Sequence, residues 1–328
     1  MFDPFDDDNW RAGTMLAWHD SALSVRPPAW LPDPGQAERR LACRLDRVLR
    51  ALGLIHSHRT VETGQLHRLD PLLPARARSR LWLDMAACGL IDVGFPIDAD
   101  GGARFHPATA RFMAVRLPAH ERIERRLDAL GFTPVEIASV GPGPLRGRRQ
   151  YDRHNLIAAE LAVVARRDGW RTAGEAWGRF DRMTGSPDAG QGGPDLELIG
   201  ERTLVCVELT ASMNESFDEK VARWRRILQY PGMERTHVAW LSAGRPGDPV
   251  AGALRARVAG EPRMHYADAR AWPDRGVVFD DGFAPEPGHV GEPDDWMRDE
   301  MSRLGRLVGF DDAGSWRLPE RLRGRWLG

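Results

Sequence analysis

The stretch GGPDLELIGERTLVCVELTAS, residues 192–212, contains two short apolar strand patterns on either side of a turn-like Gly-Glu-Arg. Three acids, Asp195, Glu197 and Glu208, lie at fixed places within these strands. An unpaired carboxylate is costly to bury, so acids inside a Val/Leu-rich strand need a physical reason. The stretch therefore predicts either a hairpin with incidental charges or half of a metal site.

The relative positions of the acids follow from the turn. A two-residue turn centred on Gly200 and Glu201 places Asp195 opposite Cys206. Side chains alternate between the faces of a strand, so all three acids share one face. Asp195 and Glu208 then become diagonal neighbours, about 7–8 Å apart. Two carboxylates at that spacing predict a site for magnesium, with manganese as a substitute, because magnesium prefers one or two carboxylates together with water and phosphate oxygens.

Lysine is almost absent from the chain. Of its 46 lysines and arginines, 45 are arginine, and Lys220 is the only lysine. Together with the many glycines and prolines, this bias indicates a GC-rich genome in which arginine replaces lysine wherever either will serve. A lysine that survives this pressure either remains by chance or performs a task that arginine cannot, since lysine is a compact charge whose pKa can shift. On the second interpretation Lys220 is a candidate catalytic residue.

The patterns around the hairpin predict one domain over residues 151–243, with the order helix, strand, strand, strand, helix, strand. A region rich in Pro, Gly and Asp follows, and residues 244–328 give no fold prediction. The expected elements of the domain are residues 151–170, 171–177, 194–200, 204–212, 215–230 and 236–244.

Before this domain, residues 37–135 predict a winged helix-turn-helix with a connecting helix, preceded by an acidic, Pro-rich arm over residues 1–36. The pattern gives a helix over 37–53, a short helix over 60–69, a helix over 75–90, and then two strands around a Gly-rich turn. The third helix, with Arg76 and Arg80 one turn apart, would enter the DNA major groove. The alternative is a helical subdomain that only mediates dimerisation. The candidate DNA contacts are Arg76, Arg78, Arg80 and Arg104.

Charge is unevenly distributed in a chain whose formal net charge is -1. Residues 37–126 hold 16 Arg against 10 Asp plus Glu, a local excess of six positive charges. Residues 136–150, rich in Gly, Pro and Arg, predict a linker between the domains. A basic segment in a neutral chain favours an anionic partner, most often nucleic acid. The linker adds the candidate DNA contacts Arg146, Arg148 and Arg149.

The second domain resembles the PD-(D/E)xK nuclease fold, in which Pro-Asp on one strand and an acid on the next build the active site. Here the matching residues are Pro194-Asp195 and Glu208. The family's lysine, two residues after the second acid, is replaced by Thr210, and the resemblance implies that Lys220 is a displaced equivalent. It also implies that Glu160, on the preceding helix, is the additional acid that some members use. The fold class implied for the chain is α+β and α/β, with a winged helix-turn-helix before a restriction-endonuclease-like αβββαβ domain.

A longer stretch, about residues 37–243, resembles the replication-relaxation proteins of actinobacterial plasmids and integrative elements. The resemblance is carried by the winged helix, the Arg-rich linker, RHNLIAAEL, PDLEL, VCVELTAS and EKVARWRRILQY in this order. His154 and Tyr230 match the family pattern as well, whereas Thr210 departs from the family's acid. The resemblance implies maintenance work on the DNA of a mobile element.

Three functions are compatible with these patterns. The first is a sequence-specific DNA-binding protein whose nuclease-like domain is a second contact module, catalytically weak or inactive. The second is an active magnesium-dependent endonuclease or nickase, a phosphodiesterase that uses Asp195, Glu208, Glu160 and Lys220. The third is a transcriptional regulator whose C-terminal domain senses a ligand or dimerises. Thr210 favours the first and third, and the lone lysine favours the second.

Composition bears on where the protein is located and what it binds. The chain has no apolar run of about 18 residues, so no membrane span is expected. The acidic N-terminus lacks the pattern of a signal peptide. Three scattered cysteines indicate buried thiols in a reducing cytoplasm. Double-stranded DNA is the expected partner, and a homodimer is also open.

Overall fold

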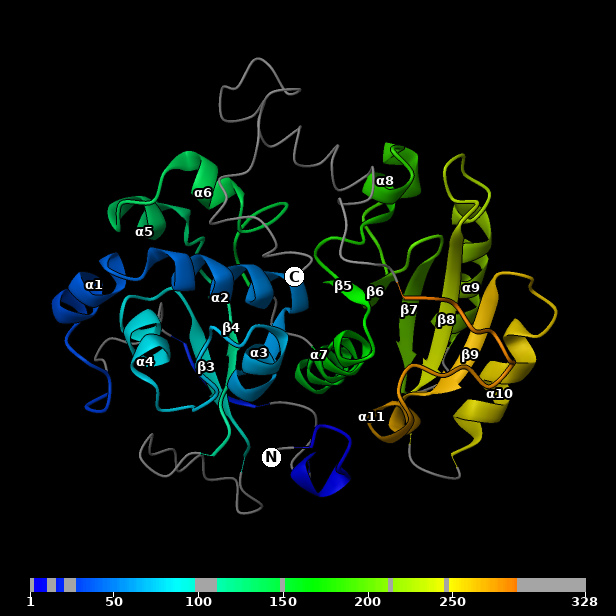
Figure 1. The fold of residues 1–328 in the computed structure, drawn as a ribbon, viewed down its shortest axis with the longest axis horizontal. Helices are drawn as coiled ribbons and strands as arrows, with labels where there is room; N and C mark the ends of the chain where they lie inside the picture. Colours follow the sequence, from blue (N-terminus) through cyan, green and yellow to red (C-terminus); the bar gives the residue numbers. More distant parts are fainter. Residues whose placement is uncertain are drawn as a thin grey trace. The chain divides into compact units, whose positions relative to one another are not determined.

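The described residues form a mixed α+β protein with two β-sheets, shown in Figure 1. The computed structural model describes residues 3–10, 16–20, 28–97, 111–147, 151–211, 215–244 and 248–287. These residues divide into two compact units, with the boundary between Ile157 and Ala158. Within the described ranges, no helix is long and apolar enough to span a membrane.

Unit 1 combines short helices with a four-stranded antiparallel sheet of order β1-β3-β4-β2. Its strands are β1 (Ala17–His19), β2 (Thr60–Glu62), β3 (Asp92–Phe95) and β4 (Ala114–Arg116). Its helices are η1 (Asp7–Trp10), α1 (Pro34–Ala42), α2 (Leu45–His58), α3 (Thr63–Leu69), α4 (Arg80–Ala87), α5 (Glu124–Ala129) and α6 (Pro134–Ala138).

Two helix boundaries of unit 1 differ from the prediction. The single helix expected over residues 37–53 is two helices, α1 and α2, because Arg44 leaves the helical conformation with φ −142°. The break expected after Leu52 is absent, and α2 runs on to His58. Leu54 and Ile55 are buried in this last part of α2, so packing outweighs the low helix propensity of Gly53.

The third predicted helix is also shorter than expected. It begins at Arg80 and not at residue 75, since Ser79 is extended with ψ 147°. The segment before it is a turn, closed by the Ser79 N–H donating to the Arg76 carbonyl at 2.9 Å. Arg76 and Arg80 therefore do not lie one turn apart on a helix, and Arg76 and Arg78 belong to the loop that precedes α4.

Unit 2 is built on a five-stranded sheet of order β5-β6-β7-β8-β9. The first three strands form an antiparallel meander, and β8 and β9 continue parallel to β7. The strands are β5 (Arg171–Gly174), β6 (Leu196–Ile199), β7 (Leu204–Thr210), β8 (Thr236–Ser242) and β9 (Met264–Asp268). The other elements are α7 (Asp152–Arg167, which begins in unit 1), α8 (Phe180–Met183), η2 (Pro187–Ala189), α9 (Glu215–Ile227), α10 (Pro249–Val258), η3 (Ala269–Ala271) and α11 (Trp272–Arg275).

The predicted order helix, strand, strand, strand, helix, strand is present as α7-β5-β6-β7-α9-β8, with α8 and η2 inserted before β6. The region without a fold prediction contributes α10 and β9, which extend the sheet by one strand. The stretch predicted as a linker is folded against unit 1 in its described part, where Val140 and Leu145 are buried.

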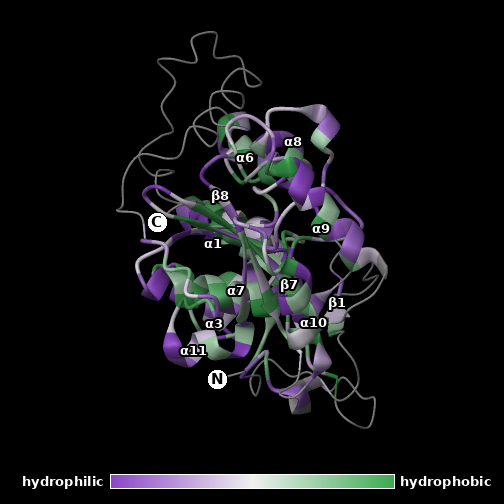
Figure 2. Ribbon diagram, turned by 90° about the vertical axis from the view of Figure 1, so that its right-hand side faces the viewer, coloured by the Kyte–Doolittle hydropathy of each residue, from purple (hydrophilic) through white to green (hydrophobic). Residues whose placement is uncertain are grey.

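The two faces of the unit 2 sheet are covered by different helices. Cys206, Val238 and Trp240 pack against residues of α9 and α10 in one hydrophobic core. The opposite face carries buried residues such as Val207 and Leu241. Figure 2 shows α7 on the side of the sheet away from α9. The face on which the three strand acids lie is therefore the α9 face.

The end of unit 2 is held on the sheet by a polar chain that the sequence does not reveal. His237 Nδ1 lies 2.8 Å from His265 Nε2, and His265 Nδ1 lies 2.9 Å from Asp281 Oδ2. The Phe283 ring stacks on His265 with centroids 3.6 Å apart. Burial, followed by the nearby His265 and Arg263, lowers the pKa of His237 to about 4. This imidazole is therefore neutral at pH 7.

Candidate functional site

The strand register places Asp195 directly opposite Glu208. Leu196 pairs with Val207, and the Asp195 N–H donates to the Val207 carbonyl at 2.9 Å. The turn is centred on Glu201 and Arg202, because the Gly200 N–H closes it onto the Thr203 carbonyl at 2.8 Å. The predicted turn is thus one residue too early, and the predicted diagonal pairing is wrong. The predicted shared face is correct, since this correction moves the register by two and keeps the alternation of side chains.

Lys220 and Trp224 from α9 both bind the Glu208 carboxylate. Trp224 Nε1 donates to Glu208 Oε1 at 2.5 Å, and Lys220 Nζ forms an ion pair with Glu208 Oε2. The Glu208 side chain is 0% exposed, whereas that of Lys220 is 39% exposed. The two donors are four residues apart, one turn of helix, so they meet the same carboxylate from one face of α9. The only lysine of the chain is therefore the counterion of a fully buried acid.

Packing of α9 on the sheet brings these two donors to β7. Phe217, Val221 and Trp224 are buried in the core beneath the helix. The Trp224 ring meets Phe180 edge to face at 4.8 Å between centroids, a favoured aromatic geometry. The indole is thereby fixed with its N–H toward Glu208.

The backbone of β7 holds Asp195 in place. Its Oδ2 accepts from the Leu209 N–H at 2.8 Å. Just before it, Gly193 lies against the loop after β5: a Cβ at this position would stand 2.0 Å from the Gly178 carbonyl oxygen. Only glycine fits such a close backbone approach. The Gly-Pro-Asp sequence thus fixes Asp195 at the start of β6.

Burial and charge set the protonation of the pair. Burial raises the pKa of Glu208 to about 7, while Lys220 lowers it and Asp195 raises it. Burial lowers the pKa of Lys220, but the carboxylates of Glu208 and Asp195 outweigh this effect, so its pKa is raised overall. Lys220 is therefore protonated at pH 7, while Glu208 titrates near neutrality.

The raised pKa of Glu208 makes stability depend on pH. The folded value of about 7 exceeds the ordinary value of 4.5, so the contribution is fully present below pH 4.5 and is lost as pH rises through 7. Glu208→Gln removes this titration. We expect its unfolding free energy relative to wild type to rise between pH 4.5 and 7.5 by on the order of 2 kcal/mol. Urea unfolding of both proteins across this range measures the difference, and a constant difference would contradict a raised Glu208 pKa.

Two further residues of the acid face are placed beside the site. Glu197 is buried opposite Cys206, and burial, together with Glu197 and Glu208, raises the pKa of the Cys206 thiol. Thr210 is buried two residues after Glu208 on the same strand face. Neither residue is a charged counterion for Glu208, and that role falls to Lys220.

Glu160 is the predicted site residue whose role stays a prediction. It is half-buried on α7, the helix that covers the face of the sheet opposite α9 (Figure 2). Asp195, Glu208 and Lys220 are brought together. Trp224 was not anticipated, and its spacing of four residues from Lys220 is the sequence signal that could have found it.

The donor set is compatible with one magnesium ion. Among the described residues, no group of three or more His, Cys, Asp or Glu side chains could hold a metal ion. Asp195 and Glu208 supply two carboxylates, and magnesium takes its remaining ligands from water and substrate phosphate. Lys220 already serves one Glu208 oxygen, so an entering cation must displace its ammonium. The long, partly exposed stem of Lys220 allows this displacement.

The predicted DNA contacts in unit 1 are exposed where they are described. Arg76, Arg78, Arg80 and Arg146 all lie at the surface. Arg76 and Arg78 lie in the loop before α4, and Arg80 is its first residue. Arg104, Arg148 and Arg149 lie outside the described residues.

Comparisons with protein-family models, curated proteins and solved structures find no match for the chain. The resemblance to replication-relaxation proteins therefore stays a prediction that rests on the motifs. Function must be inferred from the geometry of the site and of unit 1.

Proposed function

We propose that the chain is a DNA-binding protein whose second unit hydrolyses DNA phosphodiester bonds with magnesium, in the maintenance of a mobile element. The observation that carries this proposal is the convergence of Asp195, Glu208 and Lys220 at the β6–β7 hairpin. Two opposed acids and one lysine are the residue types that metal-dependent phosphodiester chemistry needs.

The order of elements in unit 1 supports DNA binding. The succession α2-β2-α3-α4-β3-β4, with β2 and β3 both paired to β4, is the order of a winged helix. In that fold α4 would be the helix that faces the major groove, and Arg80 is its one exposed residue. Exposed arginines at its start can contact phosphates and guanines.

The order of elements in unit 2 supports a nuclease-like domain. The two acids lie on antiparallel strands, and the next helix supplies Lys220. This succession, α7-β5-β6-β7-α9-β8, is the αβββαβ order of the PD-(D/E)xK fold with the lysine displaced to the helix. The displaced lysine gives Thr210 a simple explanation, because the charge lost from β7 is supplied from α9.

Each residue of the site has a distinct role in this proposal. Magnesium held by Asp195 and Glu208 would polarise the phosphodiester and lower the pKa of a bound water. Lys220, released from Glu208, would neutralise negative charge that develops on the phosphate oxygens. Trp224 keeps the Glu208 carboxylate oriented while Lys220 moves.

A second candidate, a DNA-binding protein without cleavage activity, is favoured by one observation. Both oxygens of Glu208 already have donors, Trp224 and Lys220, and the side chain is 0% exposed. If the ion pair is permanent, the pair of acids stabilises unit 2 and binds no metal.

Plasmid cleavage separates the two candidates. We expect the wild-type protein to nick or linearise supercoiled plasmid with magnesium or manganese, and Asp195→Ala to lose this activity by at least about a hundredfold. The matched control is Asp188→Ala, an exposed acid of η2, which should cut at the wild-type rate. A wild-type protein that binds DNA but leaves it intact with both metals would support the second candidate.

A further inference from the structure

Helix α1 precedes the winged-helix elements and packs on α4. Arg40 of α1 donates two hydrogen bonds to Asp84 of α4, Nε to Oδ2 at 2.9 Å and Nη2 to Oδ1 at 2.6 Å. At the other end of the contact, Cys88 Sγ lies 3.9 Å from the Pro34 carbonyl oxygen. The two helices are therefore antiparallel, with the C-terminal end of α1 beside the start of α4.

The Arg40–Asp84 pair fixes this arrangement. Asp84 is 1% exposed, and the fork of Arg40 matches its carboxylate with both oxygens. Leu41 and Ala37 of α1 are buried on the same side. Because α1 is attached to α4 by this partly buried ion pair, Arg39 has a defined position relative to Arg80.

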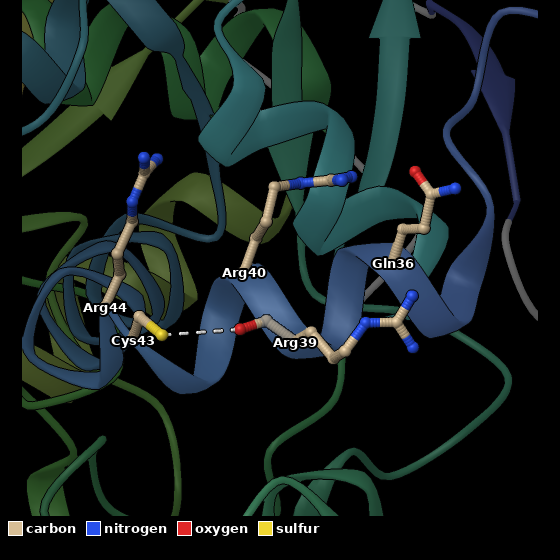
Figure 3. A pocket seen from close by; sticks show the side chains of 5 residues that line it. All are labelled: Gln36, Arg39, Arg40, Cys43 and Arg44. Carbon is tan, nitrogen blue, oxygen red and sulfur yellow. Dashed lines mark hydrogen bonds between the residues drawn. The ribbon is translucent and has the colours of Figure 1, made fainter.

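One side of α1 is hollowed and basic. A hollow of about 280 Å³ is lined by Gln36, Arg39, Arg40, Cys43 and Arg44, whose side chains Figure 3 shows. Arg39 and Arg44 are exposed, and Cys43 Sγ is turned back to the Arg39 carbonyl at 3.5 Å. The nearest acids in sequence are Glu38 and Asp46, both also exposed. With Arg40 committed to Asp84, two guanidinium groups remain to face a ligand.

We infer that this hollow of α1 binds backbone phosphates of the duplex that Arg76, Arg78 and Arg80 contact. The inference rests on the proposed DNA binding and adds a second contact to it. Guanidinium forks match phosphate oxygens, and such contacts fix the position of a protein on DNA without reading its sequence. Arg44 follows the C-terminal end of α1, which is the end nearer to the start of α4, where Arg80 lies. Arg40 is a positioning residue that holds α1 in place.

The inference is tested by the salt dependence of duplex binding, measured by fluorescence anisotropy between about 50 and 200 mM salt. In the full chain, we expect Arg39→Ala with Arg44→Ala to reduce the slope of log affinity against log salt by about two, since each phosphate contact contributes about 0.9. The loss of affinity should be equal on duplexes of unrelated sequence. The matched control is Arg125→Ala, an exposed arginine of α5, a helix that reaches the far end of α4 through Arg126 and the Cys88 carbonyl.

The double variant Arg76→Ala with Arg80→Ala separates the inference about α1 from the proposed DNA binding by unit 1. If this variant loses affinity while the α1 variant keeps the wild-type slope, the inference about α1 is overturned and DNA binding by unit 1 stands. If wild-type protein shows no salt-dependent DNA affinity, the proposed function itself fails. Unchanged melting temperatures for the surface variants ensure that a lost slope reports lost contacts.

Discussion

Lys220→Arg is expected to lower metal-dependent plasmid cleavage by about 10²–10³-fold while leaving duplex binding at the wild-type level. The ammonium of Lys220 is a compact charge held against a carboxylate that is 0% exposed. A guanidinium is planar and larger, so it cannot occupy the same position between α9 and Glu208. Initial rates of nicking, measured beside anisotropy on the same duplex, give the two quantities.

A charge-conserving control comes from the same helix. Arg226 is exposed on α9. Arg226→Lys also exchanges arginine and lysine, but at a position that does not bind Glu208. This variant should cut at the wild-type rate. If Lys220→Arg also cuts at the wild-type rate, charge alone is sufficient, and survival by chance becomes the explanation of the lone lysine. Urea unfolding of both variants separates lost chemistry from lost folding.

Much of the candidate site could be predicted from the sequence because alternation along strands is robust. Moving the turn by one residue shifted the partner of Asp195 from Cys206 to Glu208 but kept the acids on one face. The prediction failed where the turn itself decides the result, namely which residues stand opposite. Trp224 was out of reach because its role depends on how α9 packs over β7, a tertiary contact.

The fold was likewise predictable from sequence periodicity, except where tertiary contacts decide it. Apolar periodicity predicted the α7-β5-β6-β7-α9-β8 order. It gave no sign of β1 or β9. Strand β1 has only three residues and is defined by its pairing with β3, which periodicity cannot reveal. Helix ends were the least predictable feature. Gly53 suggested a break, yet burial keeps α2 helical to His58, whereas the Arg-rich segment before α4 forms a turn.

Asp152→Ala is expected to destabilise unit 1 by about 3–5 kcal/mol. Asp152, the first residue of α7, is buried and binds three donors from other parts of the unit. Its Oδ2 accepts from Trp18 Nε1 at 2.8 Å and the Leu16 N–H at 3.3 Å, and its Oδ1 accepts from Thr60 Oγ1 at 3.2 Å. Alanine leaves all three without this acceptor, and two of the three hydrogen bonds are buried. Urea unfolding measures the loss, with the exposed Asp128→Ala as a control within about 0.5 kcal/mol of wild type.

Asp152→Asn tests whether hydrogen bonds or charge hold this junction. An asparagine oxygen placed where Oδ2 lies still accepts from Trp18 and Leu16. Its amide nitrogen can donate to Thr60, because a threonine hydroxyl rotates and accepts as well as donates. All three partners are then kept, and only the charge at the start of α7 is lost, which costs about 0.3–1 kcal/mol. Equal destabilisation by asparagine and alanine would contradict the hydrogen-bond explanation and assign the stability of the junction to the negative charge.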